Sequence, residues 1–403
     1  MDTTRRISDT LQWIGVNDHH IERFENMIPV PTGIAYHAYL ITGGKTCLMD
    51  AVDVAFSERF FDNLRTALNG RPLDYIVMQH MEPDHAGSYA SLLRLWPEAR
   101  LVCSQKAFTL FKQFFEVENG ERFQIVKEGD SLDLDGPRLR FIAAPMVHWP
   151  EVIMTYEETE GTFFSADAFG SFGCTEGHLY FDQIDFHEWA ENYRRYYVNI
   201  VGRFGPQVLS VLKKAATLDI RRVCPLHGHI VRRAEDLALL LDKYQHWASY
   251  TAEEKGVVIA YASMYGHLEQ FADKLAALLS DAGVKQIRLF DVSRSHWSYL
   301  NSAVFRFSHL IVCAPNHNTE LYPLMDAFLR KLMSLNLAGR DYALAISKSW
   351  GGRAAAIAEE LLQQGKNMRA VVPCFEILSS LHKEQDEEFR AWAAAIAQSV
   401  NED

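Results

Sequence analysis

The feature that most restricts the fold is the regular pattern of residues 256–403, where short apolar runs alternate with helical patterns. The runs VVIAYAS, IRLFDV, LIVCAP, YALAIS and VVPCFEI are mostly apolar. In the segment that follows the first run, Leu268, Phe271, Leu275 and Leu278 recur at helical spacing. Strands that are apolar on both sides belong to parallel sheets covered by helices on both faces. The pattern therefore predicts a doubly wound α/β unit with five parallel strands.

Residues 30–235 have a different, mixed pattern. AYHAYLITGGKTCLMDAV contains two strand-like runs around Gly43-Gly44, which predicts a hairpin. Further short apolar runs (PLDYIVMQH, ARLVCS, LRFIAAP, TFFSADA) alternate with helical segments, as expected of an α+β unit. The polar stretch YQHWASYTAEEKG, residues 244–256, is interpreted as a linker. These patterns predict two domains, residues 1–250 and 256–403.

Composition and charge exclude several classes of protein. The 403 residues are 48% hydrophobic, which excludes a disordered chain, and the net charge of −12 argues against nucleic acid as a partner. No apolar run is long enough to span a membrane, and the N-terminus lacks the apolar region of a secretory signal. The six cysteines form no C-x-x-C pair, which excludes a zinc ribbon or a rubredoxin-type site. We expect a cytoplasmic protein without membrane contact.

The strongest functional signal is His80-Met81-Glu82-Pro83-Asp84-His85, directly after the apolar run DYIVMQ. Alternation along an extended chain places His80, Glu82 and Asp84 on one side, and a turn can bring His85 to them. Unpaired polar side chains at the end of a buried strand are costly without a partner, and a metal ion is such a partner. The segment therefore predicts a metal site.

Three more candidate ligands, His148, Asp167 and His227, also follow apolar runs. Together with the first four they make four histidines and three carboxylates, too many for one tetrahedral zinc and suited to two metals bridged by a carboxylate. Four other histidines are interpreted as ordinary surface or core residues, namely His178, His187, His229 and His246. His229 is an alternative to His227 as a ligand.

In the C-terminal half, three loops follow predicted strands at the edge where doubly wound folds bind cofactors. The first begins with Ser263, and a hydroxyl with backbone N–H groups at a helix N-terminus can hold a phosphate. The alternative for each loop is an ordinary strand-to-helix turn. The candidate residues are Ser263, Met264, Tyr265, Gly266, His267, Leu268; Pro315, Asn316, His317, Asn318; and Ser347, Lys348, Ser349, Trp350, Gly351, Gly352.

The H-x-E-x-D-H segment followed by His148, Asp167 and His227 resembles the ligand set of the flavodiiron proteins (A-type flavoproteins), over nearly the whole chain. The resemblance implies a metallo-β-lactamase-like αββα sandwich followed by a flavodoxin-like domain. It also implies FMN in the three loops and a non-haem diiron centre. In that centre His80, Glu82 and His148 would bind one iron, Asp84, His85 and His227 the other, and Asp167 would bridge them.

Glu82 distinguishes the two chemistries open to this fold. Zinc hydrolases of the fold resemble H-x-H-x-D-H, with an imidazole at this position. A carboxylate there is a hard anionic ligand that better suits redox-active iron. The alternatives are a dinuclear zinc hydrolase with a regulatory flavodoxin-like domain, and an electron carrier whose metal domain is structural.

The resemblance implies a reductase that converts O₂ to water, NO to N₂O, or both. Electrons would pass from an external donor, a rubredoxin-like protein or a reduced deazaflavin, through FMN to the diiron centre. It also implies a head-to-tail homodimer, alone or as a dimer of dimers, in which the flavin of one subunit meets the irons of the other.

Several positions carry further expectations. Tyr197, in a Tyr-Tyr-Val-Asn segment similar to one in the family, would hydrogen-bond the substrate, with core packing as the alternative. Glu25 stands where many relatives have a histidine near the irons. Trp149 and Trp350 are candidate walls of the metal pocket and the flavin site. The departures from the family's FMN loops are His267, Leu268 and Lys348, and Leu268 predicts weaker FMN binding because it lacks a threonine hydroxyl.

Overall fold

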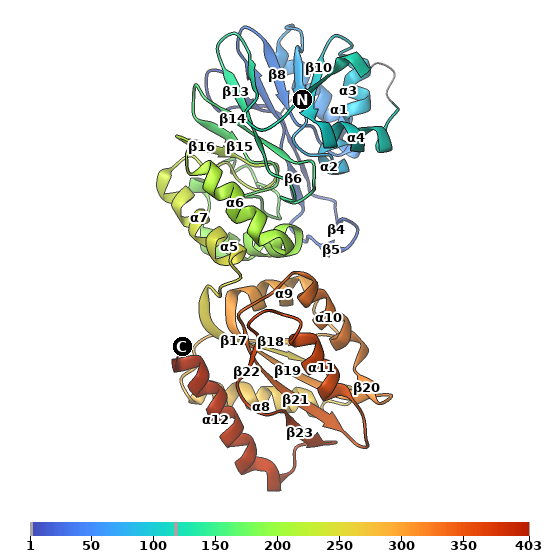
Figure 1. The fold of residues 1–403 in the computed structure, drawn as a ribbon, viewed down its shortest axis with the longest axis vertical. Coiled ribbons are helices and arrows are strands. Elements are labelled where there is room, and N and C mark those ends of the chain that lie inside the picture. The colour runs from blue at the N-terminus through green and yellow to red at the C-terminus, as the bar shows by residue number, and fades with distance from the viewer. Residues whose placement is uncertain (1–2, 117–119, 403) are drawn as a thin grey trace. The chain divides into compact units, whose positions relative to one another are not determined.

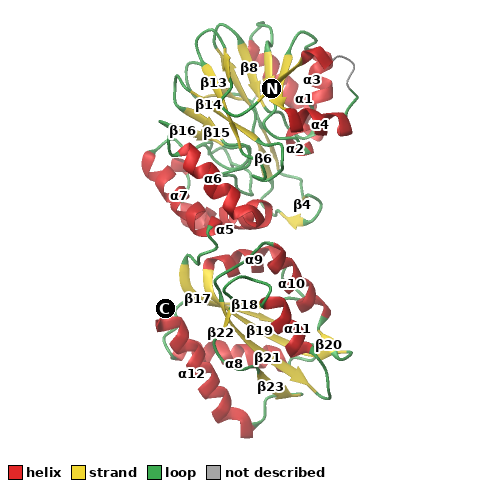
Figure 2. Cartoon of the chain, in the orientation of Figure 1, coloured by secondary structure: helices red, strands yellow, loops and turns green. Residues whose placement is uncertain are grey.

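The computed structural model describes residues 3–116 and 120–402 (Figures 1 and 2). Residues 1–2, 117–119 and 403 lie outside the described range, so the outermost ends of the two predicted domains are not described. The chain forms two compact units, Met1–Tyr197 with Pro206–Leu241, and Val198–Gly205 with Asp242–Asp403. Each unit is described by itself.

The first unit is built on two facing sheets. Apolar side chains from both, among them Val77, Val102, Phe141 and Phe164, form one core between them. The Gly43-Gly44 hairpin is confirmed, with Thr42 paired to Thr46. The seven-stranded sheet has the order β1 (Arg5–Arg6), β2 (Leu11–Trp13), β7 (Tyr39–Thr42), β8 (Thr46–Met49), β9 (Tyr75–Val77), β10 (Arg100–Ser104), β11 (Phe123–Val126). The five-stranded sheet has the order β12 (Ser131–Asp133), β13 (Arg138–Ala143), β14 (Ile153–Glu157), β15 (Thr162–Phe164), β16 (Arg222–Cys224).

Helices cover the outer faces of these sheets, which makes the predicted αββα sandwich (Figure 2). On the seven-stranded sheet lie α1 (Ser57–Leu68), α3 (Tyr89–Leu95) and α4 (Gln105–Phe114), and beside the five-stranded sheet lie α5 (Phe186–Tyr196), α6 (Gly205–Ala215) and α7 (Ala234–Ala248). Two small hairpin-like sheets, β3 (Val16–Asp18) with β6 (Ile34–Tyr36) and β4 (Arg23–Phe24) with β5 (Ile28–Pro29), and the one-turn helix α2 (Pro83–Ala86) complete the unit.

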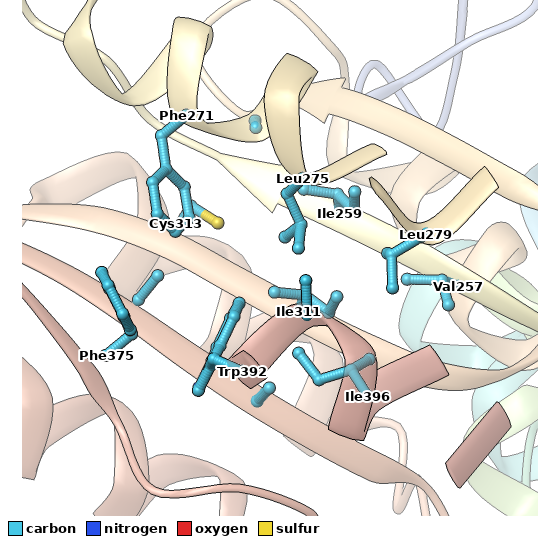
Figure 3. Packing of buried hydrophobic residues seen from close by; sticks show 14 of the residues in the cluster. Val257, Ile259, Phe271, Leu275, Leu279, Ile311, Cys313, Phe375, Trp392 and Ile396 are labelled. Atoms are coloured by element: carbon cyan, nitrogen blue, oxygen red, sulfur yellow. The ribbon is translucent and has the colours of Figure 1, made fainter. Parts of the chain in front are cut away.

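The second unit contains the predicted doubly wound parallel sheet. Its order is β18 (Ile287–Asp291), β17 (Glu254–Tyr261), β19 (Phe307–His317), β21 (Asp341–Lys348), then β22 (Arg369–Ala370) and β23 (Phe375–Leu378), with the short antiparallel β20 (Glu320–Leu321) beside β19. Figure 3 shows one face, where α8 (His267–Asp281) and α12 (Asp386–Glu402) pack on alternate strand residues such as Ile259 and Ile311. The intervening residues Val258 and Val312 face the other side and are also buried, beneath α9 (Trp297–Arg306), α10 (Pro323–Ser334) and α11 (Ala354–Leu362).

Two details of this unit differ from the sequence analysis. The fifth predicted strand, the run VVPCFEI at residues 371–377, is a strand only from Phe375, as β23; the short β22 precedes the run, and Pro373, which has no N–H to donate to the sheet, lies between the two strands. Helices α9 and α12 were not identified; α9 supplies the crossover that the parallel strands β18 and β19 require.

The predicted linker, residues 244–256, is wrong over most of its length. Tyr244 and Trp247 belong to α7 and are buried, and Trp247 Nε1 donates to Glu253 Oε1 at 2.7 Å. β17 then begins at Glu254, so only residues 249–253 connect the two elements. Tyr244 and Trp247 are three residues apart and so lie on one face of the helix. The polar residues around them hid this helical spacing in the sequence. The assignment of residues 1–250 to a diiron domain and 256–403 to an FMN domain stays a prediction.

Candidate metal centre and flavin loops

Local structure explains how the 80–85 segment presents four polar side chains. The chain leaves β9 extended as far as Glu82, whose φ and ψ are −60° and 137°. Pro83 then occupies the first turn of α2, where its fixed φ is favourable and its missing N–H costs nothing. The helical turn brings Asp84 and His85 back beside the extended residues, so the expected turn is the single-turn helix α2.

The remaining candidates come from loops of the five-stranded sheet. His148 lies between β13 and β14, Asp167 follows β15, and His227 follows β16. The seven side chains gather into two buried groups, one of His80, Glu82, His148 and Asp167, the other of Asp84, His85 and His227. We call the first three residues the His80 half-site and the second group the His227 half-site; Asp167 lies between them.

In the His80 half-site, the ligand atoms converge on one point. Glu82 Oε2 lies 3.2 Å from His80 Nε2 and 3.0 Å from His148 Nε2. Asp167 Oδ2 lies 3.2 Å and 3.1 Å from the same two nitrogens.

The His227 half-site has the same arrangement around the other oxygen of Asp167. Asp84 Oδ2 is 3.3 Å from both His85 Nε2 and His227 Nε2, which lie 3.0 Å from each other. Asp167 Oδ1 is 3.3 Å from His85 Nε2 and 3.6 Å from His227 Nε2. Asp167 therefore presents one oxygen to each half-site, the geometry of a bridging carboxylate.

The polar atoms of this centre fit a pair of metal ions. Both oxygens of Asp84 and of Asp167 are buried and have no hydrogen-bond partner in the described part of the chain. Burial opposes protonation of His148, but Asp167 and Glu82 raise its pKa to about 9. Such buried carboxylates and imidazoles are compensated by metal ions, which displace the protons when they bind. The donor set of four imidazoles and three carboxylates suits two divalent or trivalent transition metals.

The outer nitrogens of the imidazoles are held differently in the two half-sites. His80 Nδ1 lies 2.8 Å from Glu151 Oε1, whereas His227 Nδ1 lies 2.7 Å from the carbonyl oxygen of Ala35. His85 Nδ1 has no hydrogen-bond partner among the described residues. The donated Nδ1–H of His80 and His227 leaves each Nε2 lone pair available to a metal.

Aromatic rings surround the centre. The ring of Tyr36 contacts those of His85 and His227, at centroid distances of 6.5 and 5.8 Å, and Phe24 lies 5.7 Å from His227. Sequence analysis missed both residues, since nothing near them in the chain suggests a metal. Trp149 packs against His80, with a centroid distance of 5.2 Å, and its role as a wall of the metal pocket stays a prediction.

The tyrosine pair at the end of α5 divides between two positions. Tyr196 contacts His227, with a centroid distance of 5.4 Å, and it approaches the 167–170 loop so closely that a Cβ on Gly170 would lie 2.9 Å from its ring. Tyr197 is fully buried at the C-terminal cap of α5. Its role toward the substrate stays a prediction.

Glu25 lies close to the centre, as expected. The residue is exposed at the turn between β4 and β5, but its carboxyl shares a hydrogen bond with Glu82. Desolvation, followed by the charge of Glu82, raises the pKa of Glu25 to about 7. Its position adds a further carboxyl group beside the His80 half-site.

His229 belongs to neither half-site. Its Nδ1 lies 3.0 Å from the Tyr193 hydroxyl, and Trp189 packs edge-on against its ring at 4.5 Å. The geometry therefore favours His229 as a core histidine and not as a metal ligand.

The candidate flavin loops lie at the carboxyl ends of β17, β19 and β21. The first follows its strand as predicted, but Pro315, Asn316 and His317 are the last residues of β19, and Ser347 and Lys348 are the last residues of β21. Ser263 Oγ is buried and has no hydrogen-bond partner in the described residues, and Gly266 turns the chain into α8 with a φ of 87°. An unpaired hydroxyl beside a helix N-terminus fits a phosphate group. Ala354 N–H, at the start of α11 directly after the third loop, donates to Asn316 Oδ1 at the end of β19, at 3.0 Å. Tyr265 and Trp350 expose 85% and 70% of their surface.

Leu268 differs from its expected place in the phosphate loop. Its side chain is 3% exposed and belongs to the core of the unit, with Phe271 and Phe375. Leu268 lies three residues before Phe271, so both side chains are on the apolar face of α8 that packs into the core. Lys348, another departure from the family pattern, is paired with Glu376 at 2.6 Å.

None of the helices in the parts of the chain that the structure describes is long and apolar enough to cross a membrane.

Comparison with known proteins agrees with this arrangement. Residues 34–228 match the model of the ODP family beta lactamase. The chain is 31% identical to an anaerobic nitric oxide reductase flavorubredoxin of Aeromonas hydrophila, covering 89% of this chain and 73% of the relative. It is also 31% identical to a nitric oxide reductase of Moorella thermoacetica, over 89% and 90%. The rubredoxin oxygen:oxidoreductase of Desulfovibrio gigas superposes with a TM-score of 0.92 at 26% identity, covering 99% of both chains. Two-domain architecture, ligand pattern and relatives agree, and the chain belongs to the flavodiiron protein family.

Proposed function

We propose that this chain is an oxidoreductase that reduces O₂ to water, NO to N₂O, or both, with a non-haem diiron centre and FMN. The observation that carries the proposal is Asp167, whose two oxygens face two separate groups of ligands in a chain that also contains three flavin-type loops. The similarity to nitric oxide reductases and to a rubredoxin oxygen:oxidoreductase supports this reaction class. The zinc hydrolase alternative is not favoured.

The residues of the first unit would prepare a pocket for a small gas. When bound, the irons and the flavin supply adjacent Lewis-acid positions and the transfer of electrons to the substrate. Asp167 holds the two half-sites at a fixed separation. Tyr36, Phe24 and Tyr196 exclude water from the His227 half-site, and Trp149 packs against the His80 half-site. Tyr197 is the residue we assign to hydrogen-bonding the substrate.

The residues of the second unit would bind FMN. We assign the phosphate to Ser263 Oγ and to the N–H groups at the start of α8, because that hydroxyl is buried without a partner. The loops after β19 and β21 would enclose the ring system. The six cysteines of the chain form no C-x-x-C pair, so we propose a separate donor, a rubredoxin-like protein or a reduced deazaflavin.

We further propose a head-to-tail homodimer, alone or as a dimer of dimers. It is supported by three large apolar side chains exposed on the flavin loops, Met264, Tyr265 and Trp350. Co-expression of a metal-deficient chain (Asp167→Ala) with a flavin-deficient chain (Gly266→Leu) tests transfer between subunits. About half of the randomly paired dimers are hybrids with one intact path, so roughly a quarter of the activity should return. No recovery would place transfer within one subunit.

The function itself is tested by stopped-flow oxidation of the fully reduced protein with O₂ and with NO in parallel. We expect rapid oxidation by at least one gas, with water or N₂O as product, whereas Asp167→Ala should form neither product, because O₂ that reacts with reduced flavin alone is converted to H₂O₂. Tightly bound zinc with no oxidation by either gas would support the hydrolase instead.

A further inference from the structure

We propose that Glu151 is a positioning residue that makes the two halves of the metal centre unequal. Its buried carboxylate acts through His80 to hold the metal of the His80 half-site more tightly, and at a lower reduction potential, than the metal of the His227 half-site. This inference rests on the proposed function, because it assumes that both half-sites hold iron.

The contact itself is a charge-assisted hydrogen bond inside the protein. His80 Nδ1 and Glu151 Oε1 are 2.8 Å apart, and neither side chain is exposed to solvent. A ligating imidazole that donates its outer N–H to a carboxylate becomes a stronger electron donor at the metal. A stronger donor stabilises the ferric state relative to the ferrous state, which lowers the reduction potential.

The carboxylate has few other partners to share its charge. Oε1 also accepts the backbone N–H of Met81, at 2.9 Å. Oε2 is buried and has no hydrogen-bond partner in the described part of the chain. Because a buried anion is costly without compensation, the interaction with His80 and the metal beyond it is the main one available to Glu151.

The backbone around Glu151 is fixed from both sheets. Its carbonyl oxygen accepts the Ser104 hydroxyl at 2.8 Å, at the end of β10. Two residues later, Ile153 N–H donates to the carbonyl of Gln79 at 3.1 Å, directly before His80. The loops that carry the histidine and the carboxylate are therefore tied together, so the contact does not depend on a freely moving side chain.

Among the residues that the structure describes, the His227 half-site has no equivalent of Glu151. His227 donates its Nδ1–H to the neutral carbonyl of Ala35, at 2.7 Å. Hydrogen bonds to an ionised acceptor are about twice as strong as those between neutral groups. The difference between an anionic and a neutral acceptor is what makes the half-sites unequal, although each offers two imidazoles and one carboxylate besides Asp167.

The test is Glu151→Gln in the full-length, iron-loaded protein. Glutamine retains an oxygen that can accept the Nδ1–H but removes the charge. Under anaerobic reducing conditions with a ferrous chelator, we expect one of the two irons to leave about 10–100-fold faster than in the wild type, and the other at an unchanged rate. Anomalous diffraction at the iron edge identifies the vacated half-site. Redox titration followed by electron paramagnetic resonance should show a raised potential for the same iron.

Glu157→Gln is the matched control, because Glu157 is also buried, at the end of the strand β14 that follows Glu151, and accepts the backbone N–H groups of Thr159 and Glu160 at 2.7 and 2.8 Å. It should leave both irons and both potentials unchanged. The inference is overturned if Glu151→Gln behaves like this control, or if both irons are released equally.

A wild type that holds fewer than two irons, or is oxidised by neither gas, would instead contradict the proposed function. If Glu151→Gln does not accumulate as folded protein, Glu151→Asp keeps the charge but withdraws it from Nδ1 by one methylene. It should accelerate release from the His80 half-site alone, and release as in the wild type would overturn the inference.

Discussion

The metal centre of the first unit and the flavin loops of the second unit are built in opposite ways. All seven side chains of the metal centre are buried, and they come from both sheets of the sandwich. The flavin loops follow three strands of one sheet, and Tyr265 and Trp350 are largely exposed on them. A bare ion needs a dry, preformed set of ligands, whereas a large planar cofactor can bind at the edge of a sheet. A change in the metal centre should therefore have larger effects than a change in a flavin loop.

The largest effect is expected from Asp167→Ala. One carboxylate serves both half-sites, so its removal should weaken iron binding by more than about 100-fold and abolish gas reduction. Elemental analysis and stopped-flow oxidation measure this. Asp219→Ala, which removes an exposed carboxylate paired with Arg221, should keep both irons. Full iron content in Asp167→Ala would show that the half-sites do not depend on the bridge.

Leu268→Thr tests whether position 268 serves the stability of the second unit or its binding of FMN. Because this side chain lies in the core, we expect a loss of about 3 kcal/mol in the unfolding free energy, without tighter FMN binding. Leu324→Thr, at a residue that is 46% exposed on α10, should change stability by less than about 0.5 kcal/mol. Chemical denaturation and an FMN titration compare them. If the Leu268→Thr variant is stable and binds FMN more tightly, position 268 belongs to the phosphate-binding loop and not to the core.

His37 makes the first unit sensitive to acid. It accepts from Trp13 Nε1 and donates to the Gly228 carbonyl, both at 2.7 Å, and burial lowers its pKa from 6.5 to about 3. Between these values the unfolded chain binds the extra proton, so stability falls as the pH drops below 6.5, by about 2 kcal/mol at pH 5.

Glutamine can make both hydrogen bonds of His37 without titrating. Unfolding at pH 6.5 and pH 5 should therefore show a smaller loss in His37→Gln than in the wild type. His20→Gln, at an exposed residue, should retain the full loss. Equal losses in all three proteins would exclude His37 as the cause.

The smallest effect is expected in a flavin loop. A Cβ on Gly352 would lie 2.5 Å from Asn316 Oδ1, the atom that accepts the Ala354 N–H. Gly352→Ala should therefore displace the loop and weaken FMN binding by about tenfold, or about 1.4 kcal/mol. Gly351→Ala is the control, since its Cβ would meet no protein atom within 4 Å. If both variants bind FMN equally weakly in a fluorescence titration, contact with the flavin rather than loop packing is responsible.

The parts predicted from the sequence were those with a local signal. Apolar strands and amphipathic helices predicted the parallel sheet of the second unit, while the αββα sandwich of the first unit was implied by the family resemblance. The 80–85 segment predicted the position of four polar side chains that the structure brings together with three distant ones. Errors arose where the local signal was ambiguous. The polar stretch at 244–256 concealed the buried Tyr244 and Trp247. Leu268 was assigned both to the apolar stripe of a helix and to a loop motif, and the structure places it in the core.

The sequence by itself determined which residue types end each strand, because strand apolarity and ligand chemistry are properties of neighbouring residues. Only the tertiary structure decided what surrounds them. Glu151 and His80 are 71 residues apart in the chain, and Ala35 and His227 are 192 apart. No periodicity connects such pairs, since their hydrogen bonds form only when loops from different parts of the chain meet. The difference between the two half-sites is therefore a property of the fold, although every ligand in them can be found in the sequence.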